Sequence, residues 1–108
     1  MLDEREFPKR ADEALTRLYK SLAAASDEHA FEADYGGALT IEFEEPPAKF
    51  VVSPNAPVKQ IWVSALMKSY KLEWDPARQE FVLPETGQSL QQLISGVVSN
   101  QLGVDVSL

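Results

Sequence analysis

The sequence contains no cysteine and only one histidine, His29. Without thiols the chain cannot form a disulfide, a thiolate metal site or a thiol nucleophile. One imidazole cannot serve both a catalytic triad and a metal cage. Any metal site must therefore rest on carboxylates with one imidazole at most, and such ligands suit hard, exchangeable cations.

Several functional motifs are also missing. No glycine-rich loop opens a helix, because Gly36-Gly37 is placed between two strand-like segments, and no serine sits in a nucleophile elbow. No basic patch alternates with aromatic residues, and no apolar run reaches membrane-spanning length. The acidic start, Met1 to Glu4, does not read as a signal or transit peptide, so we expect a cytoplasmic protein without side-chain catalysis or an organic cofactor.

What the chain does have is negative charge, and the charge is unevenly placed. The net charge is −7, and the whole excess of acidic side chains falls at or before Glu45. Such a field disfavours nucleic acid and anionic membranes as partners. It favours cations or a basic protein surface.

The length of 108 residues predicts one domain spanning residues 1–108. A first helix is expected from Asp3 to about Ala25, with an apolar stripe at steps of three and four and Asp3 as the N-cap. Pro8 is tolerated only in a first turn, so the helix either begins after Asp3 or bends there.

Six segments then read as strands, bounded by glycine, proline and polar residues. Gly36-Gly37 predicts a hairpin turn, Pro46-Pro47 a strand end and residues 53–57 a turn. Residues 65–69 are expected to be a loop that connects another hairpin. The expected strands are residues 31–35, 38–44, 49–53, 57–64, 70–74 and 80–83.

A second helix follows from Ser89, which forms a capping box with Gln92, to a C-cap at Gly103. Gly96 is expected to allow close packing against the first helix, and the tail 104–108 to lie between the helices. The order of elements predicts an α+β, two-layer sandwich, with two terminal helices on one face of a five- to six-stranded antiparallel sheet. The other face is left to solvent or a partner.

The segment 57–64 indicates what the uncovered face could do. Ile61 and Val63 point to one side of the strand, whereas Gln60, Trp62 and Ser64 point to the other. A tryptophan among polar neighbours suits recognition of a partner. The alternative, that Trp62 packs against a neighbouring strand or loop, stays open at this point.

Four segments together resemble the frataxin family, whose bacterial members are called iron donor or iron–sulfur assembly proteins. The most specific of them contains a proline followed by two variable residues and then Gln-Ile-Trp. The segments are Glu6-Phe7 with Ala11-Asp12-Glu13-Ala14-Leu15, Gly36-Gly37-Ala38-Leu39-Thr40-Ile41, Pro57-Val58-Lys59-Gln60-Ile61-Trp62-Val63-Ser64, and Gly87-Gln88-Ser89-Leu90-Gln91-Gln92-Leu93-Ile94.

The resemblance implies an iron-binding accessory protein of iron–sulfur cluster assembly in the bacterial cytoplasm. It implies contacts to a cysteine desulfurase and an iron–sulfur scaffold protein through Asn55, Gln60, Trp62 and Lys71. It also implies an acidic ridge that binds Fe2+ or Fe3+ weakly, which here maps onto Asp3, Glu4, Glu6, Asp12, Glu13, Asp27, Glu28, Glu32 and Asp34. The chain departs from the family pattern at Pro8, Ser53 and Pro54, and Lys9 and Arg10 interrupt the ridge.

Two other functions remain open beside this one. The first is a ferroxidase that stores iron as an oligomer, although the chain lacks the Glu-x-x-His pairs of di-iron bundles. The second is a metal-free acidic adaptor. His29, beside Asp27 and Glu28, is either an additional iron ligand or a solvated loop residue. We expect a monomer in isolation, with an iron-induced oligomer as the alternative.

Overall fold

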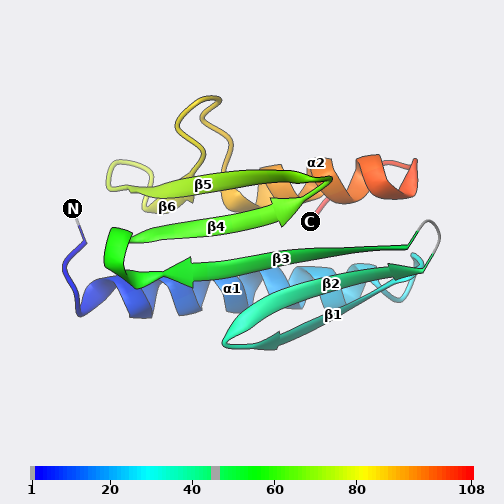
Figure 1. Ribbon diagram of the computed structural model, residues 1–108, viewed down its shortest axis with the longest axis horizontal. Coiled ribbons are helices and arrows are strands. Elements are labelled where there is room, and N and C mark those ends of the chain that lie inside the picture. The colour runs from blue at the N-terminus through cyan, green and yellow to red at the C-terminus, as the bar shows by residue number, and fades with distance from the viewer. Residues whose placement is uncertain (1, 45–46) are drawn as a thin grey trace.

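Two helices lie on the same side of a six-stranded antiparallel sheet in the computed structural model, which describes residues 2–44 and 47–108 (Figure 1). Helix α1 spans Glu6–Ala25 and helix α2 spans Leu90–Leu102. The predicted two-layer α+β architecture is therefore confirmed.

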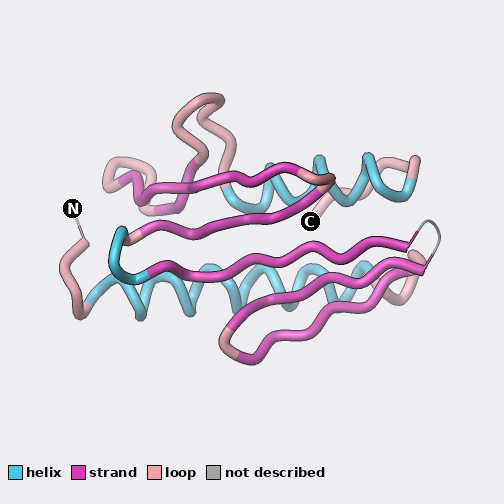
Figure 2. The backbone as a smooth tube through the Cα atoms, viewed as in Figure 1, coloured by secondary structure: helices cyan, strands magenta, loops and turns pink. Residues whose placement is uncertain are grey.

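The strands follow one another across the sheet in chain order, so each pairs with its sequence neighbours (Figure 2). A short 3-10 helix, η1 (Ala56–Val58), joins the two central strands. The strands are β1 (Phe31–Gly36), β2 (Ala38–Glu44), β3 (Pro47–Asn55), β4 (Gln60–Ala65), β5 (Lys68–Asp75) and β6 (Glu80–Val82).

The core forms between the sheet and the helices because alternate strand residues face inward. Fully burying a valine, leucine, isoleucine or phenylalanine side chain contributes about 1.5–3 kcal/mol to the stability of the fold. The sheet contributes Phe31, Leu39, Ile41, Phe43, Phe50, Val52, Ile61, Val63, Leu72 and Phe81, and α1 contributes Phe7, Ala11, Leu15, Leu18 and Leu22.

Helix α1 begins three residues after Asp3, and Pro8 lies in its first turn. The Asp3 carboxylate accepts hydrogen bonds from the N–H groups of Arg5 and Glu6 at 2.8 and 2.7 Å. These bonds, led by the one from Glu6, lower the pKa of Asp3. The N-cap of α1 is Arg5, which forms no side-chain capping bond, so the predicted N-cap was two residues early. Asp3 still satisfies two backbone N–H groups at the start of the helix.

A contact between side chains joins α1 to the edge strand β1. The Tyr35 hydroxyl donates a hydrogen bond of 2.6 Å to Asp12 Oδ1, and the rings of Tyr35 and Tyr19 lie 6.4 Å apart. Burial, followed by the bond to Asp12, raises the pKa of Tyr35 to about 12.

The turn before β4 differs from the prediction. Residues 53–55 continue β3, and the chain reverses through η1, so that Pro57 and Val58 are helical rather than extended. Lys59 then takes a left-handed conformation with φ 54° before β4 begins at Gln60. Pro47 is the first residue of β3, whereas Pro46 lies outside the described residues.

The loop predicted for residues 65–69 is a tight turn instead. Strand β4 runs to Ala65, β5 starts at Lys68, and Ala65 pairs with Lys68. Leu66 and Met67 have φ values of 53° and 61°, the backbone of a two-residue hairpin turn that usually takes asparagine and glycine. The expected hairpin is confirmed, but its connection is shorter than predicted, because the sequence carries no such residues here to indicate a tight turn.

The second helix begins and ends as predicted. Ser89 and Gln92 form the capping box, and Gly103 ends the helix with φ 74°. The tail lies along α2, where Ser99 Oγ bonds both the N–H and the carbonyl of Val106. The expectation for Gly96 was wrong: it is exposed, and a Cβ there would meet no atom within 4 Å.

This exposed glycine gives a stability prediction. Gly96→Ala should raise the free energy of unfolding by about 0.5–1 kcal/mol, because alanine loses less backbone entropy in a helix interior. Urea denaturation measures the change. Gly103→Ala is the matched control and should lower stability, because its φ is positive. A neutral or destabilising effect of Gly96→Ala would contradict the exposed position of Gly96 inside α2.

The Tyr35 contact predicts a dependence on alkaline pH. The folded pKa of Tyr35 is raised above the unfolded value of 10, so its contribution is complete below pH 10 and is lost as pH rises toward about 12. The stability difference between wild type and Tyr35→Phe should therefore shrink across this range, as measured by urea denaturation at each pH. A constant difference would argue against the Tyr35–Asp12 bond.

Candidate functional site

The face of the sheet away from the helices carries the predicted partner-binding residues. Strand register places Asn55 opposite Gln60, and Gln60 opposite Glu73. The neighbouring row consists of Ser53, Trp62 and Lys71. The four predicted residues, Asn55, Gln60, Trp62 and Lys71, therefore occupy two adjacent rows across β3, β4 and β5.

Trp62 is exposed and its orientation is set by its neighbours. The indole is 38% exposed, and its Nε1 donates a 2.9 Å hydrogen bond to Gln60 Oε1. Gln60 Nε2 in turn donates to Glu73 Oε2 at 3.3 Å. The Lys71 ammonium lies 4.9 Å from the centre of the indole, which is a cation–π contact. The indole is thus held in place on the surface rather than packed under a loop.

A hollow adjoins this cluster on the outer face. The lining includes Val51, Ser53, Trp62, Ser64, Tyr70 and Lys71. We call the surface formed by Asn55, Gln60, Trp62, Lys71 and this hollow the outer-face cluster.

Glu73 bonds Gln60 of the outer-face cluster but was missed by sequence reasoning. Period-two alternation already placed it on the side of β5 opposite Leu72. Its pairing with Gln60, however, depends on the register set by the turn at Leu66 and Met67, which was predicted as a longer loop.

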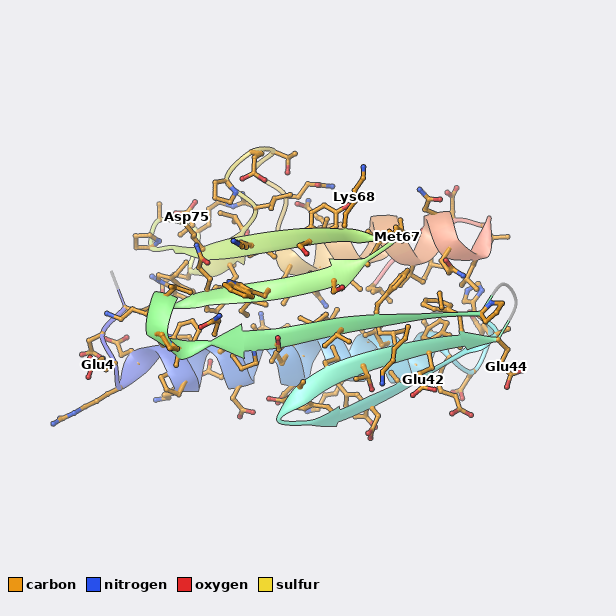
Figure 3. The ribbon with its side chains drawn as sticks, in the orientation of Figure 1. Glu4, Glu42, Glu44, Met67, Lys68 and Asp75 are labelled. Atoms are coloured by element: carbon orange, nitrogen blue, oxygen red, sulfur yellow. The ribbon has the colours of Figure 1, made fainter. Side chains whose placement is uncertain are left out.

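The predicted acidic ridge is exposed but extended. All nine carboxylate residues of the prediction are exposed: Asp3, Glu4, Glu6, Asp12, Glu13, Asp27, Glu28, Glu32 and Asp34. A helix of 20 residues is about 30 Å long, so the acids before α1 and those after it lie far apart. Figure 3 likewise shows Glu4 and Glu44 at opposite ends of the molecule. Over residues 2–44 and 47–108, no three His, Asp or Glu side chains form a group suited to holding a metal ion.

Two acids of the ridge are already engaged within the protein. Asp12 accepts the Tyr35 hydroxyl, and Glu13 lies 3.8 Å from the Arg10 guanidinium. Both line a hollow on the solvent side of α1 together with Arg17 and Lys20. Cations therefore border the carboxylates on this part of the ridge.

The outer face of β1 and β2 carries further carboxylates. Glu32 stands directly opposite Glu42, and Glu42 stands opposite Lys49 on β3. Like charges facing each other are destabilising unless a cation lies nearby. Glu42 was not among the predicted residues, although its outward position was, because the pairing with Glu32 requires the hairpin register.

His29 lies where the end of α1 meets the C-terminal tail. It is half-buried and lines a hollow with Glu28 and Asp105. The structure therefore places it against the tail rather than in a fully solvated loop.

None of the helices in the described part of the chain is long and apolar enough to cross a membrane.

Comparison with known proteins places these features in a family. A model of the frataxin-like domain matches residues 1–104. The chain is 31% identical over 107 residues to the iron–sulfur cluster assembly protein CyaY of Dechloromonas aromatica, covering 99% of each chain. It is 32% identical over 112 residues to CyaY of Cupriavidus metallidurans, covering 99% of this chain and 96% of that one.

A solved structure agrees with this assignment at the level of the fold. Frataxin from Psychromonas ingrahamii superposes with a TM-score of 0.77 at 20% identity, covering 98% of this chain and 97% of that one. With an antiparallel sheet under two terminal helices and a family match over almost its whole length, the chain belongs to the frataxin-like family.

Proposed function

We propose that this protein is an accessory component of iron–sulfur cluster assembly in the bacterial cytoplasm. It docks through the outer-face cluster on the complex of cysteine desulfurase and scaffold protein, and it binds iron weakly through surface carboxylates. The observation that carries the proposal is an exposed indole, Trp62, held in one orientation on an uncovered sheet face. The relatives named above carry the matching role in their names.

The arrangement around Trp62 lowers the cost of binding. A side chain that is already oriented loses little conformational entropy when a partner covers it. Gln60 accepts the indole N–H, so this group keeps its hydrogen bond when water leaves. Tryptophan is enriched among residues that dominate binding energy, so Trp62 is the expected centre of the interface.

The acidic surface supports docking by long-range attraction. Neighbouring strands lie about 4.8 Å apart, so β1 and β4 are separated by roughly 14 Å. One partner surface can therefore cover Trp62 and reach the carboxylates of Glu32 and Glu42. A basic partner would be steered toward this face by the net charge of −7.

Iron would bind as a cargo ion on the same carboxylates. Exposed carboxylates supply hard oxygen ligands, and water completes the coordination of the ion. Such binding is weak and exchangeable, which suits delivery rather than storage. Glu32 stands directly opposite Glu42 in the strand register, and a cation there would relieve their repulsion.

The docking proposal predicts the effect of removing the indole. Trp62→Ala should weaken binding to a bacterial desulfurase–scaffold complex by roughly 30-fold, or about 2 kcal/mol, in biolayer interferometry. Val104→Ala is the matched control, because Val104 is an exposed apolar residue after α2. An equal loss of affinity in both variants, or no loss in either, would overturn the assignment of the outer-face cluster as the docking surface.

The iron proposal predicts which amide signals respond to metal. Anaerobic titration with Fe2+ should broaden the amide signals of Glu32, Asp34 and Glu42 before those elsewhere. Glu42→Gln should lower the affinity about threefold to tenfold, because one charge near the ion is worth on the order of 1 kcal/mol in a solvated site. Glu85→Gln, at another exposed carboxylate, should change little.

Two outcomes would replace this role with another. Oxygen consumption that exceeds the buffer rate and is lost in Glu42→Gln would favour a ferroxidase. Docking without any perturbation of amide signals by iron would favour a metal-free adaptor.

A further inference from the structure

The two edge strands of the sheet differ in how much of their backbone is left open. Strand β6 is three residues long, and Val82 forms a bridge with Ser89, so little of its outer edge remains free. Strand β1 is six residues long and pairs with β2 along its whole length, and in the part of the chain that the structure describes no strand lies on its other side (Figure 1). Alternate residues of β1 therefore point their N–H and C=O groups away from the sheet.

Strand β1 lacks most of the features that protect an edge strand from pairing. It contains no proline and no lysine, and its register with β2 advances one residue at a time, without a bulge. It does carry Glu32 and Asp34, both exposed. Two copies of β1 placed side by side would bring these carboxylates close together, which is destabilising. Pairing with a second copy is therefore disfavoured, whereas a strand of opposite charge meets no such repulsion.

The negative charge around β1 is unbalanced on the outer face of the sheet. Residues 21–48 contain seven acidic side chains and no lysine or arginine. The first cation across the sheet is Lys49 on β3, two strands and about 10 Å from β1, and it stands opposite Glu42. The helical side differs, because two basic and two acidic side chains of α1 line one hollow there: Asp12, Glu13, Arg17 and Lys20. A strand added to β1 thus meets unbalanced negative charge on its outer face.

We propose that the outer edge of β1 binds an extended basic segment of a partner protein by strand addition, with lysine or arginine at alternate positions. The backbone of the segment pairs with β1 and continues the sheet. Its basic side chains lie on the outer face beside Glu32 and Asp34, and the residues between them face α1. The inference rests on the proposed docking to a basic partner, but it concerns a different surface from the outer-face cluster.

A blocked heptapeptide that alternates lysine and threonine is a suitable probe, and its glutamate counterpart is the charge control. We expect saturable amide shifts along β1 and slower hydrogen exchange of its outward N–H groups with the lysine peptide only. Glu32→Gln combined with Asp34→Asn should weaken binding about fivefold, because opposite charges on neighbouring strands attract. Glu4→Gln combined with Glu85→Gln removes the same charge at exposed positions outside the sheet, and this control should bind as wild type.

N-methylation of the peptide separates backbone pairing from charge attraction. The N–H groups of one alternate set of residues face β1, and those of the other set face away from it. Methylating the lysine set and methylating the threonine set should therefore give affinities that differ about tenfold or more, because only one change removes hydrogen bonds to β1. Trp62→Ala should bind the peptide as wild type does, because Trp62 lies on β4.

Three results would overturn the proposal. Equal binding of the two N-methylated peptides, or equal weakening by the two double variants, would mean that binding follows overall charge. Protection of β1 amides that rises with protein concentration in the absence of peptide would mean that a second copy occupies the edge. If the peptide fails to bind while Trp62→Ala still weakens docking on the desulfurase–scaffold complex, this inference fails and the proposed function stands.

Discussion

The alternation of inward and outward side chains along six antiparallel strands is the constraint on which the rest of the structure depends. Two helices bury the inward set, from Leu39 on β2 to Phe81 on β6. A register shift of one residue would turn every side chain of a strand to the other face. Burial of Ile61 and Val63 therefore requires that Gln60 and Trp62 face outward. The exposed indole is thus a consequence of the core.

The turns convert this alternation into specific neighbours. The turn at Leu66 and Met67 places Lys71 opposite Trp62 and Glu73 opposite Gln60. Two non-glycine residues with positive φ are costly, at roughly 1–2 kcal/mol each. Met67 is fully exposed, whereas Leu66 packs against the core, which offsets part of that cost. The register of the outer-face cluster is thus stabilised from the core side.

Charge separates the surfaces of the molecule. Carboxylates extend along α1 and over the outer face of β1 and β2, where a basic partner or a hydrated cation would be attracted. The outer-face cluster, with Lys71 beside Trp62, lies on the same face of the sheet as the carboxylates of β1 and β2.

Sequence patterns determined the class of fold, both ends of α2 and the outward direction of Trp62. These features depend on local periodicity and on short-range capping, as at Ser89 and Gly103. The resemblance to the frataxin family also rested on the sequence alone, and the family match over residues 1–104 confirmed it. The nine carboxylate ligands stay a prediction.

Only the tertiary structure decided which side chains meet. Pairing of Gln60 with Glu73 follows from the register of β4 and β5, which the sequence of the Leu66-Met67 turn did not reveal. Pairing of Glu32 with Glu42 follows from the register of the β1–β2 hairpin. The hydrogen bond from Tyr35 to Asp12 depends on how α1 sits on the sheet. Such contacts join residues distant in the chain, and local propensity carries no information about them.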